Sequence, residues 1–353
     1  MTQALATPPV GVDDVDGTLV CTAVNPVTHD VTDFVLEAEE PARFSFEPGQ
    51  HLTVTVPVAG QRLSRCYSLS SPPTRPDSLT ITVKRVPGGP VSNWLHDHLR
   101  PGDLLEVAGP IGVFTPVAHP STKQLYLTAG SGITPLMSAA RTLVDEGRPV
   151  DVVLVHHART PDDIVFREEL DRMSERHPGI RVIVVCEDDA PTHSWAGPRG
   201  RINPDLLARV VPDAADREVF LCGPPPYMEA ARACLALAGV DPACIHEESY
   251  VFGGVSIPDT VHDGTVATYS VELRRSGRVV HCPAGTTVLD AASRAGLQLP
   301  SSCREGVCGT CKTTMLAGAV DMNHAGGIRQ REIDRGQVLL CCSTPTEDLV
   351  LDA

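Results

Sequence analysis

Residues 303–311 read CREGVCGTC and residues 340–345 read LCCSTP, so five cysteines lie in two short stretches near the C-terminus. The chain has 12 cysteines among 353 residues. Its first residues, MTQALATPP, contain neither a basic start nor an apolar run, so we predict no export signal and a cytoplasmic location. Disulfides are rare in that reducing compartment. We therefore expect the clustered thiols to bind metal.

The spacing of these cysteines distinguishes between kinds of metal site. Cys303, Cys308, Cys311 and Cys341 follow the pattern C-x4-C-x2-C-x29-C, and its first three positions match the plant-type spacing for a 2Fe-2S cluster. A structural zinc site usually has paired C-x2-C units, and only one such pair occurs here. We predict these four cysteines as cluster ligands and Cys342 as packing, because neighbouring side chains on a strand point opposite ways.

Bulk properties describe a soluble protein with more than one domain. A length of 353 residues suggests two or three domains. The net charge of −15 leaves no basic face to neutralise phosphates, so we expect no nucleic-acid partner. The sequence contains no uncharged apolar run of about 18 residues, and we predict no membrane span.

Changes in hydrophobic periodicity divide the chain into segments. Residues 17–118 contain short alternating runs such as HLTVTV and LTITVKRV between Gly and Pro turns, which predicts an antiparallel β-barrel. Residues 119–250 alternate strand-like and helical patterns, which predicts a parallel sheet with helices, an α/β domain. Residues 1–16 read as a flexible tail and residues 251–264 as a linker. Residues 265–353 suggest a hairpin, a short helix and the cysteine loop, an α+β domain of β-grasp type.

Two motifs in the predicted barrel resemble the flavin site of the ferredoxin–NADP reductase family. Residues 65–68, RCYS, match its R-x-Y-S motif, and residues 89–92, GPVS, match its FAD-binding G-x-x-S at the start of a predicted helix. The resemblance implies that Arg65 neutralises flavin phosphate, Tyr67 packs on the isoalloxazine ring and Ser68 bonds near flavin N5. Free N–H groups at the helix start suit a pyrophosphate, which favours FAD over FMN. The resemblance further implies these flavin-site residues: Lys84, Gly89, Val91 and Ser92.

Further motifs resemble the family's nicotinamide site. Residues 130–135, GSGITP, are not the Rossmann G-x-G-x-x-G but match the family's G-x-G-x-T-P, and residues 222–224, CGP, match its C-G-P. The resemblance implies that Cys222 lies near the hydride path, and that the last strand brings Glu248 and Tyr250 against the flavin. It implies these nucleotide-binding residues: Gly130, Gly132, Thr134, Pro135, Cys222, Gly223 and Pro224.

The adenosine end of the coenzyme is expected at Arg159 and Thr160, after the second strand of the parallel sheet. An Arg there binds a 2′-phosphate or stacks on adenine. Asp162 and Asp163 would repel an extra phosphate, which favours NADH over NADPH, and they equally suit capping of a predicted helix over residues 162–176.

Residues 265–353 resemble a plant-type ferredoxin domain. The order FAD barrel, nicotinamide domain and C-terminal ferredoxin resembles reductase components of bacterial oxygenases, especially those serving Rieske-type demethylases of betaine-like quaternary amines. The resemblance implies that NAD(P)H reduces FAD, and that the 2Fe-2S cluster passes electrons to a terminal oxygenase or another one-electron acceptor protein. Reductases of haem monooxygenases and of the hybrid-cluster protein are alternatives.

Two other functional classes remain open at this point. A non-catalytic redox sensor could use the same flavin and cluster, and fast NAD(P)H-dependent reduction of cytochrome c would exclude it. A zinc-stabilised binding module would contain zinc without iron.

Overall fold

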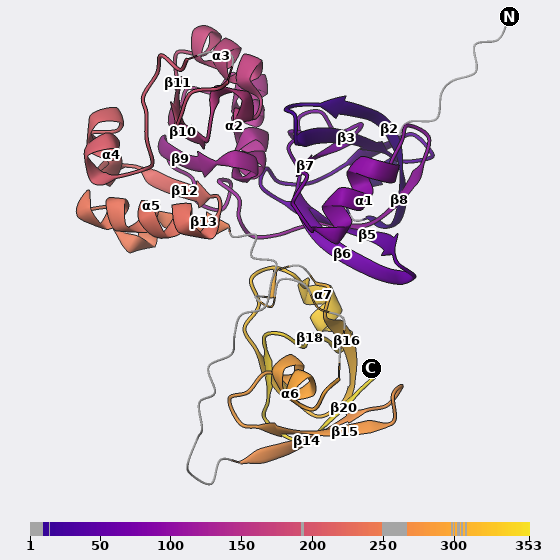
Figure 1. Cartoon of the computed structure of the whole chain (residues 1–353). Coiled ribbons are helices and arrows are strands. Elements are labelled where there is room, and N and C mark those ends of the chain that lie inside the picture. Colours follow the sequence, from indigo (N-terminus) through magenta and orange to yellow (C-terminus); the bar gives the residue numbers. More distant parts are fainter. Residues whose placement is uncertain are drawn as a thin grey trace, which may run out of the picture. The chain divides into compact units, whose positions relative to one another are not determined.

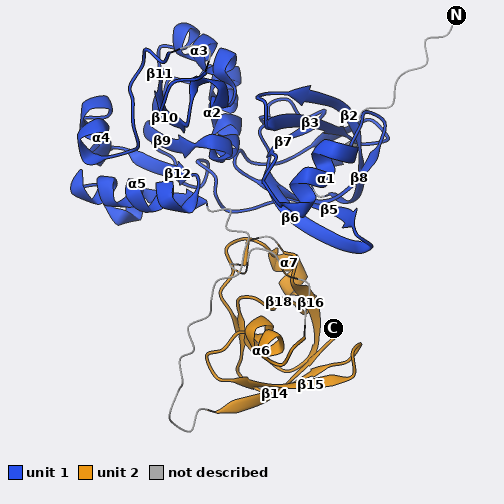
Figure 2. Cartoon of the chain, viewed as in Figure 1, with its two compact units in different colours: residues 1–250 blue, residues 251–353 orange. Residues whose placement is uncertain are grey.

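The computed structural model describes residues 10–13, 15–191, 194–248, 267–297, 299, 301, 304, 306–307 and 309–353. The chain forms two compact units, residues 1–250 and residues 251–353 (Figure 2). Among the helices of these described ranges, none is long and apolar enough to cross a membrane.

The N-terminal part of the first unit is an antiparallel sheet that closes on itself (Figure 1). Its strands are β2 (Val15–Pro26), β3 (Val31–Glu37), β5 (His51–Val58), β6 (Gln61–Ser68), β7 (Leu79–Lys84) and β8 (Leu104–Ile111). They are ordered β6-β5-β8-β2-β3-β7, and an antiparallel bridge between Leu69 and Ile81 joins the two edges. Alternate side chains of β5, such as Leu52, Val54 and Val56, are buried in one apolar core. The predicted antiparallel barrel is confirmed.

One helix and a short pair of strands complete the barrel. Helix α1 (Pro90–His98) places Val91 and Leu95 in the barrel core. Strand β1 (Val10–Val12) pairs in parallel with β4 (Ala42–Phe44). The predicted tail over residues 1–16 is therefore too long, since strand structure begins at Val10. A strand of three residues is too short for its alternation to be recognised in the sequence.

A parallel sheet forms the rest of the first unit. Its elements are β9 (Lys123–Ala129), α2 (Thr134–Glu146), β10 (Asp151–Ala158), α3 (Arg167–Arg176), β11 (Ile180–Cys186), α4 (Pro204–Val210), β12 (Glu218–Cys222), α5 (Pro225–Leu237) and β13 (Ile245–Glu248). The strand order is β11-β10-β9-β12-β13, and all pairs are parallel. Helices α2 and α3 cover one face and α4 and α5 the other, each over its own apolar core (Figure 1). The predicted α/β domain is confirmed.

The helix predicted over residues 162–176 is wrong in its first turn. Residues Pro161–Asp163 form a separate 3-10 turn, and α3 begins only at Arg167. Phe166, immediately before α3, has a left-handed backbone with φ of 61°. A non-glycine residue in that conformation breaks a helix, and sequence periodicity does not reveal it.

The second unit is a mixed sheet with a helix packed on it. Its elements are β14 (Thr268–Leu273), β15 (Arg278–Pro283), α6 (Val288–Arg294), β16 (Lys312–Ala317), β17 (Val320–Met322), α7 (Gln330–Ile333), β18 (Gln337–Leu339), β19 (Ser343–Pro345) and β20 (Leu349–Leu351). The main sheet has the order β15-β14-β20-β16-β18, with β14 and β20 parallel. Buried side chains of α6 and the sheet share one core. The predicted α+β class is confirmed for this unit.

Candidate functional site

A buried hydrogen bond joins the last strand residue of the barrel motif to the edge of the parallel sheet. Ser68 ends β6, Glu248 ends β13, and the Ser68 hydroxyl donates to Glu248 Oε2 over 3.0 Å. Both residues are buried although 180 positions separate them. The structure therefore brings together two residues that the sequence placed at the flavin from opposite domains. Tyr250, the third such residue, lies outside the described residues.

Side chains of β6 line the same region. Arg65 and Tyr67 alternate with buried Cys66 along the strand, and both are half-buried. The Arg65 Nη1 donates to the Ser64 carbonyl over 2.7 Å, which holds the guanidinium along the strand. Burial raises the pKa of the Tyr67 hydroxyl, so this ring stays neutral and suits stacking on a flat apolar ligand.

The turn before α1 fits a phosphate. A Cβ added to Gly89 would lie 2.7 Å from the Ser92 hydroxyl, so a larger residue there would displace the Ser92 side chain. Ser92 accepts a hydrogen bond from the Val86 N–H over 3.2 Å and donates to the Gly89 carbonyl over 3.2 Å. Val91 is buried in the barrel core. These side chains thus fix the conformation of the turn. The backbone N–H groups in the first turn of α1 are available to bind a ligand phosphate.

Lys84 and Arg159 share an acid between the two domains. The Lys84 Nζ lies 2.7 Å from Asp30 Oδ2, and the Arg159 Nη2 lies 3.8 Å from the same oxygen. Burial alone would raise the pKa of Asp30, but its hydrogen bond to Lys84 lowers that pKa overall. The carboxylate therefore stays charged and ties a barrel strand to the end of β10. Whether Lys84 also lines the flavin stays a prediction.

A left-handed glycine and a close backbone contact shape the turn between β9 and α2. Gly130 has a φ of 54°, and a Cβ on Gly132 would lie 2.5 Å from the Cys222 carbonyl oxygen. Glycine is therefore required for the turn to lie against the end of β12. Thr134 donates its hydroxyl to the Ser131 carbonyl over 3.1 Å, and Pro135 lies in the first turn of α2. This arrangement is typical of a turn that binds phosphate at a helix start.

Cys222 ends β12 beside Glu248, which ends β13. The two residues are direct neighbours in the β12–β13 register, and Cys222 is fully buried. Burial, with a smaller contribution from the Glu248 charge, raises the pKa of the Cys222 thiol far above its usual value. Cys222 is therefore a neutral thiol. Gly223 and Pro224 follow it, and Pro224 is the residue that precedes α5.

Two buried side chains near this turn have polar atoms without a well-formed hydrogen bond in the described part of the chain, and sequence reasoning missed them as site residues. His157 at the end of β10 is buried, and neither of its ring nitrogens makes a hydrogen bond of normal geometry to a described residue. The buried Tyr227 hydroxyl on α5 likewise has no partner in the described structure. The two rings lie 5.0 Å apart, and a Cβ on Gly223 would lie 2.7 Å from the Tyr227 ring. Buried polar groups are nearly always bonded, so these atoms fit a dinucleotide bound at this edge.

At the expected adenosine end, Thr160 has a local partner. Its hydroxyl donates to Asp163 Oδ2 over 2.8 Å, and its backbone N–H donates to the same oxygen over 3.1 Å. Arg159 forms an ion pair with Asp163 as well. Asp163 therefore caps the separate 3-10 turn, and the interpretation that Asp162 and Asp163 cap the predicted helix is wrong, because α3 begins only at Arg167.

Helix α2 is hydrogen-bonded to the loop that follows β6, and the sequence did not indicate these contacts. Arg141 Nη1 donates to the Ser70 carbonyl over 2.7 Å, and the Ser138 hydroxyl donates to the Ser71 carbonyl over 2.7 Å. Arg141 also pairs with Glu169 of α3 at 2.6 Å. The helix that begins at the nicotinamide turn is thus fixed to the loop that follows Ser68.

In the second unit, two of the four predicted cluster ligands lie side by side. Cys311 and Cys341 are buried, and the Cys341 backbone N–H lies 3.4 Å from Cys311 Sγ. N–H groups directed at sulfur are typical of thiolates that hold an iron–sulfur cluster. Cys303 and Cys308 lie outside the described residues.

The fourth ligand position differs from the expected strand. Cys341 and Cys342 lie in the turn between β18 and β19, so strand alternation does not separate their roles. Cys342 instead donates its thiol to the Leu339 carbonyl over 3.7 Å. Gly306 and Gly309 both have a φ of 70°, a left-handed conformation that suits glycine in a tight loop around a cluster.

Protein-family models match the three parts of the chain in order. An oxidoreductase FAD-binding domain matches residues 18–115, an oxidoreductase NAD-binding domain matches residues 126–233, and a 2Fe-2S iron-sulfur cluster binding domain matches residues 271–346. The geometric fit of the flavin turn, the nicotinamide turn and the thiol pair therefore agrees with the cofactors of these families.

The chain is similar over nearly its whole length to curated proteins. It is 40% identical to the glycine betaine monooxygenase reductase subunit of Pseudomonas aeruginosa strain UCBPP-PA14, covering 94% of both chains. It is 38% identical to the stachydrine N-demethylase reductase subunit of Rhizobium meliloti strain 1021, covering 95% of this chain and 96% of the relative. Among solved structures, phthalate dioxygenase reductase has a TM-score of 0.57 and 26% identity, covering 95% of this chain and 97% of that one. The chain therefore belongs to the family of reductase components of oxygenases, in which an FAD-binding, an NAD-binding and a 2Fe-2S domain are joined in one polypeptide.

Proposed function

We propose that this protein is the NADH-dependent reductase of a Rieske-type monooxygenase that demethylates a betaine-like quaternary amine. The observation that carries the electron-transfer part is the buried Ser68–Glu248 hydrogen bond, which joins the end of the flavin strand to the end of the nicotinamide sheet. The partner class is supported by relatives that are reductase subunits for glycine betaine monooxygenase and stachydrine N-demethylase.

Each side of the site has its own task in this proposal. When bound, FAD accepts a hydride from the nicotinamide, and the 2Fe-2S cluster passes on single electrons. Arg65 and the N–H groups before α1 bind the flavin phosphates, and Tyr67 packs on the ring. Ser68 and Glu248 orient each other, and the neutral Cys222 thiol keeps water away from them.

The preference for NADH rests on charge pairing at the edge where β10 and β11 end. Arg159 pairs with Asp163, Arg199 with Asp189 at 2.5 Å, and Arg201 with Glu187 at 2.9 Å. A 2′-phosphate needs an arginine whose charge is not already neutralised, and each of these three has an acid beside it. NADPH would have to displace one of these carboxylates.

A cytoplasmic location belongs to the same proposal. None of the ten cysteines described in the structure is in a disulfide, which suits a reducing compartment. The oxygenase that accepts the electrons would be a separate protein in the same compartment.

Two cysteine variants test the electron path. We expect Cys341→Ser to lose the cluster, to keep NADH-driven reduction of ferricyanide by the flavin, and to lose electron delivery to a purified glycine betaine oxygenase component. The matched variant Cys342→Ser should retain both activities and the EPR signal of the reduced cluster. Equal loss of dye reduction and delivery in Cys341→Ser would contradict the proposed order of carriers.

A coenzyme titration tests the NADH preference. We expect kcat/KM for NADH to exceed that for NADPH by at least about tenfold, the effect of about 1.4 kcal/mol. Asp163→Asn removes the carboxylate that neutralises the Arg159 guanidinium. This change should raise kcat/KM for NADPH and so reduce the preference for NADH over NADPH. A wild-type protein that uses NADPH better would overturn this part of the proposal and leave the oxygenase partner untouched.

A further inference from the structure

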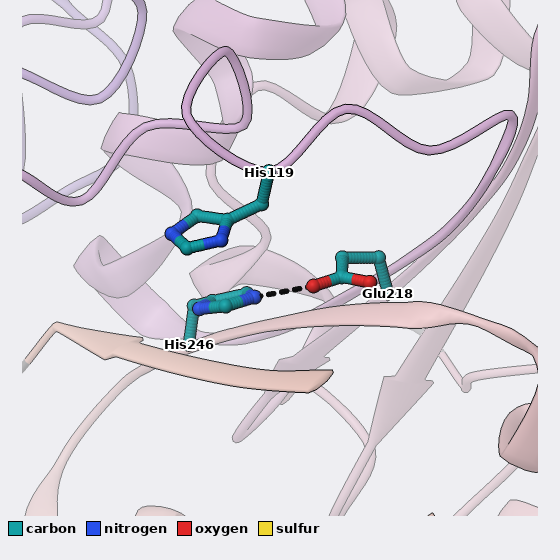
Figure 3. Close-up of side chains that lie close together, drawn as sticks. All are labelled: His119, Glu218 and His246. Carbon is teal, nitrogen blue, oxygen red and sulfur yellow. Dashed lines mark hydrogen bonds and ion pairs between the residues drawn. The ribbon is translucent and has the colours of Figure 1, made fainter. Parts of the chain in front are cut away.

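Three side chains with metal-binding atoms, none of them assigned to flavin or coenzyme, converge at the edge of the parallel sheet (Figure 3). His119 lies in the connector, residues 112–122, between β8 and β9; Glu218 begins β12, and His246 lies on β13. One nitrogen or oxygen from each lies within 4.8 Å of the others. Each residue is partly buried.

The geometry within this group is close to that of a coordination site. His246 Nε2 lies 2.6 Å from Glu218 Oε1, and the rings of His119 and His246 stack with centroids 3.5 Å apart. Ligand atoms around a tetrahedral zinc ion lie about 3.3 Å from one another, from bond lengths of about 2.0–2.2 Å. The three ligand atoms lie within 4.8 Å of one another, and the stacked imidazole rings would turn to direct one nitrogen each at a shared ion.

The hydrogen bond between His246 and Glu218 accounts for the positions of these two side chains but not for that of His119. The His119 side chain makes no hydrogen bond to a described residue, although its ring stacks on His246 and lies 6.3 Å from the Phe220 ring. A packing role alone would suit an apolar ring at this place. Two rigid strands hold the other ligands, and preorganised ligands favour metal binding.

We propose that His119, Glu218 and His246 bind a zinc ion, with the fourth position open to water. Two His and one Glu with an open position are an established zinc donor set. The ion would bind the connector to β12 and β13. His246 stands two positions before Glu248 on the same face of β13, so the ion would also restrain the strand that presents Glu248 to Ser68.

Equilibrium dialysis of the holoprotein against buffered Zn²⁺, followed by elemental analysis, tests this site. The protein keeps its FAD and its cluster, so that the cluster cysteines are not available to zinc, and iron per chain reports that they remain occupied. We expect one zinc per chain for the wild type. His119→Phe keeps a ring on His246 but removes the nitrogen, and it should lower zinc affinity by at least about tenfold.

Two further variants separate zinc binding from damage to the fold. Glu218→Gln keeps a partner for His246 but removes the charge, and should also lose zinc. His281→Ala removes an exposed histidine on β15 of the other unit and should bind zinc like the wild type. Zinc should raise the midpoint of thermal unfolding of the wild type and leave that of His119→Phe unchanged. Absence of zinc from the wild type, or equal zinc in His119→Phe with normal flavin content, would overturn the proposal.

Discussion

At the scale of single residues, the site depends on polar atoms whose partners are visible only after folding. The R-x-Y-S, G-x-G-x-T-P and C-G-P motifs could be recognised from the sequence because each carries its chemistry in consecutive positions. His157 and Tyr227 could not, because one is on a strand and the other on a helix. Only the register of β10 and the start of α5 bring their rings to 5.0 Å. A histidine on an apolar strand gives no indication of whether its nitrogens are bonded.

The Tyr227 hydroxyl gives a test in which stability and affinity change in opposite directions. A buried hydroxyl without a partner costs free energy in the free protein. Tyr227→Phe should therefore leave the unliganded protein equally or more stable. If the hydroxyl bonds the coenzyme, the same change should raise KM for NADH by about tenfold, the value of one hydrogen bond of ~1.4 kcal/mol, with kcat nearly unchanged.

Thermal unfolding and steady-state kinetics measure these two effects. Tyr269, a half-buried residue of β14 in the other unit, provides the control variant Tyr269→Phe, for which KM should not change. An unchanged KM in Tyr227→Phe would place the hydroxyl outside the coenzyme site.

At the scale of elements, periodicity predicted which segments are strands and helices but not where they touch. The barrel and the parallel sheet followed from period-two runs and from alternating patterns. The early end of the tail at Val10 and the late start of α3 did not, because a three-residue strand and a left-handed Phe166 leave no periodic trace. The contact of α2 with the loop after β6 could not be predicted from the sequence either, because Arg141 donates to a backbone carbonyl, which any residue type would supply.

Arg141 should matter more than a neighbouring arginine that makes a similar ion pair. Its side chain is only 12% exposed, bonds Ser70 and Glu169, and lies over the Phe166 ring at 4.7 Å. Arg141→Gln should slow flavin reduction by NADH about tenfold or more, because a small misplacement of reacting groups is costly. Stopped-flow absorbance of the flavin measures this rate.

The control is Arg75, which pairs with Asp145 of the same helix but is 59% exposed. An exposed ion pair contributes about 0–1 kcal/mol, so Arg75→Gln should leave the rate nearly unchanged. Similar rates in both variants would show that the α2 contact does not position the reacting groups.

Two buried histidines on strand β10 should make the stability of the first unit depend on pH, because burial keeps both of them neutral. Burial lowers the pKa of His156 from 6.5 to about 3 and that of His157 to about 4. The unfolded chain therefore binds more protons than the folded chain below pH 6.5, and stability is lost as pH falls from there towards 4 and 3. Each group contributes about 1.4 kcal/mol per pH unit in that range.

Replacing His156 should reduce this acid sensitivity. His156→Asn retains a partner for the Thr128 hydroxyl, which lies 2.9 Å from His156 Nδ1. We expect the thermal midpoint of the first unit to fall less steeply between pH 6.5 and 4.5 than in the wild type. Parallel pH dependence in the two proteins would mean that His156 is not the group that titrates.

At the scale of the whole molecule, the chain separates into one unit for flavin and coenzyme and another for the cluster. The order of the three domains was predictable because each carries its own local motif. The division into two units was not, since it depends on contacts of the barrel with α2 and β13. A chain ending at residue 250 should fold, bind FAD and reduce ferricyanide with NADH at nearly the rate of the full protein.

The same shortened chain should fail to deliver electrons to an oxygenase component, because the cluster is gone. Cytochrome c reduction and flavin content of the purified fragment measure both outcomes. An insoluble fragment without flavin would show that residues 251–353 are needed for the first unit to fold.

The hydrogen bonds from Ser138 and Arg141 to the backbone after β6 have a consequence for building chimeric enzymes. A chimera joined in the connector at residues 112–122 would take its barrel from one parent and its helix α2 from the other. The contacts between α2 and the loop after β6 would then come from two proteins that did not evolve together. Exchange of partner specificity between relatives should therefore join the parents after residue 250, where the first unit ends. There the transplanted segment brings its own core, and the hydride-transfer machinery is inherited intact from a single parent.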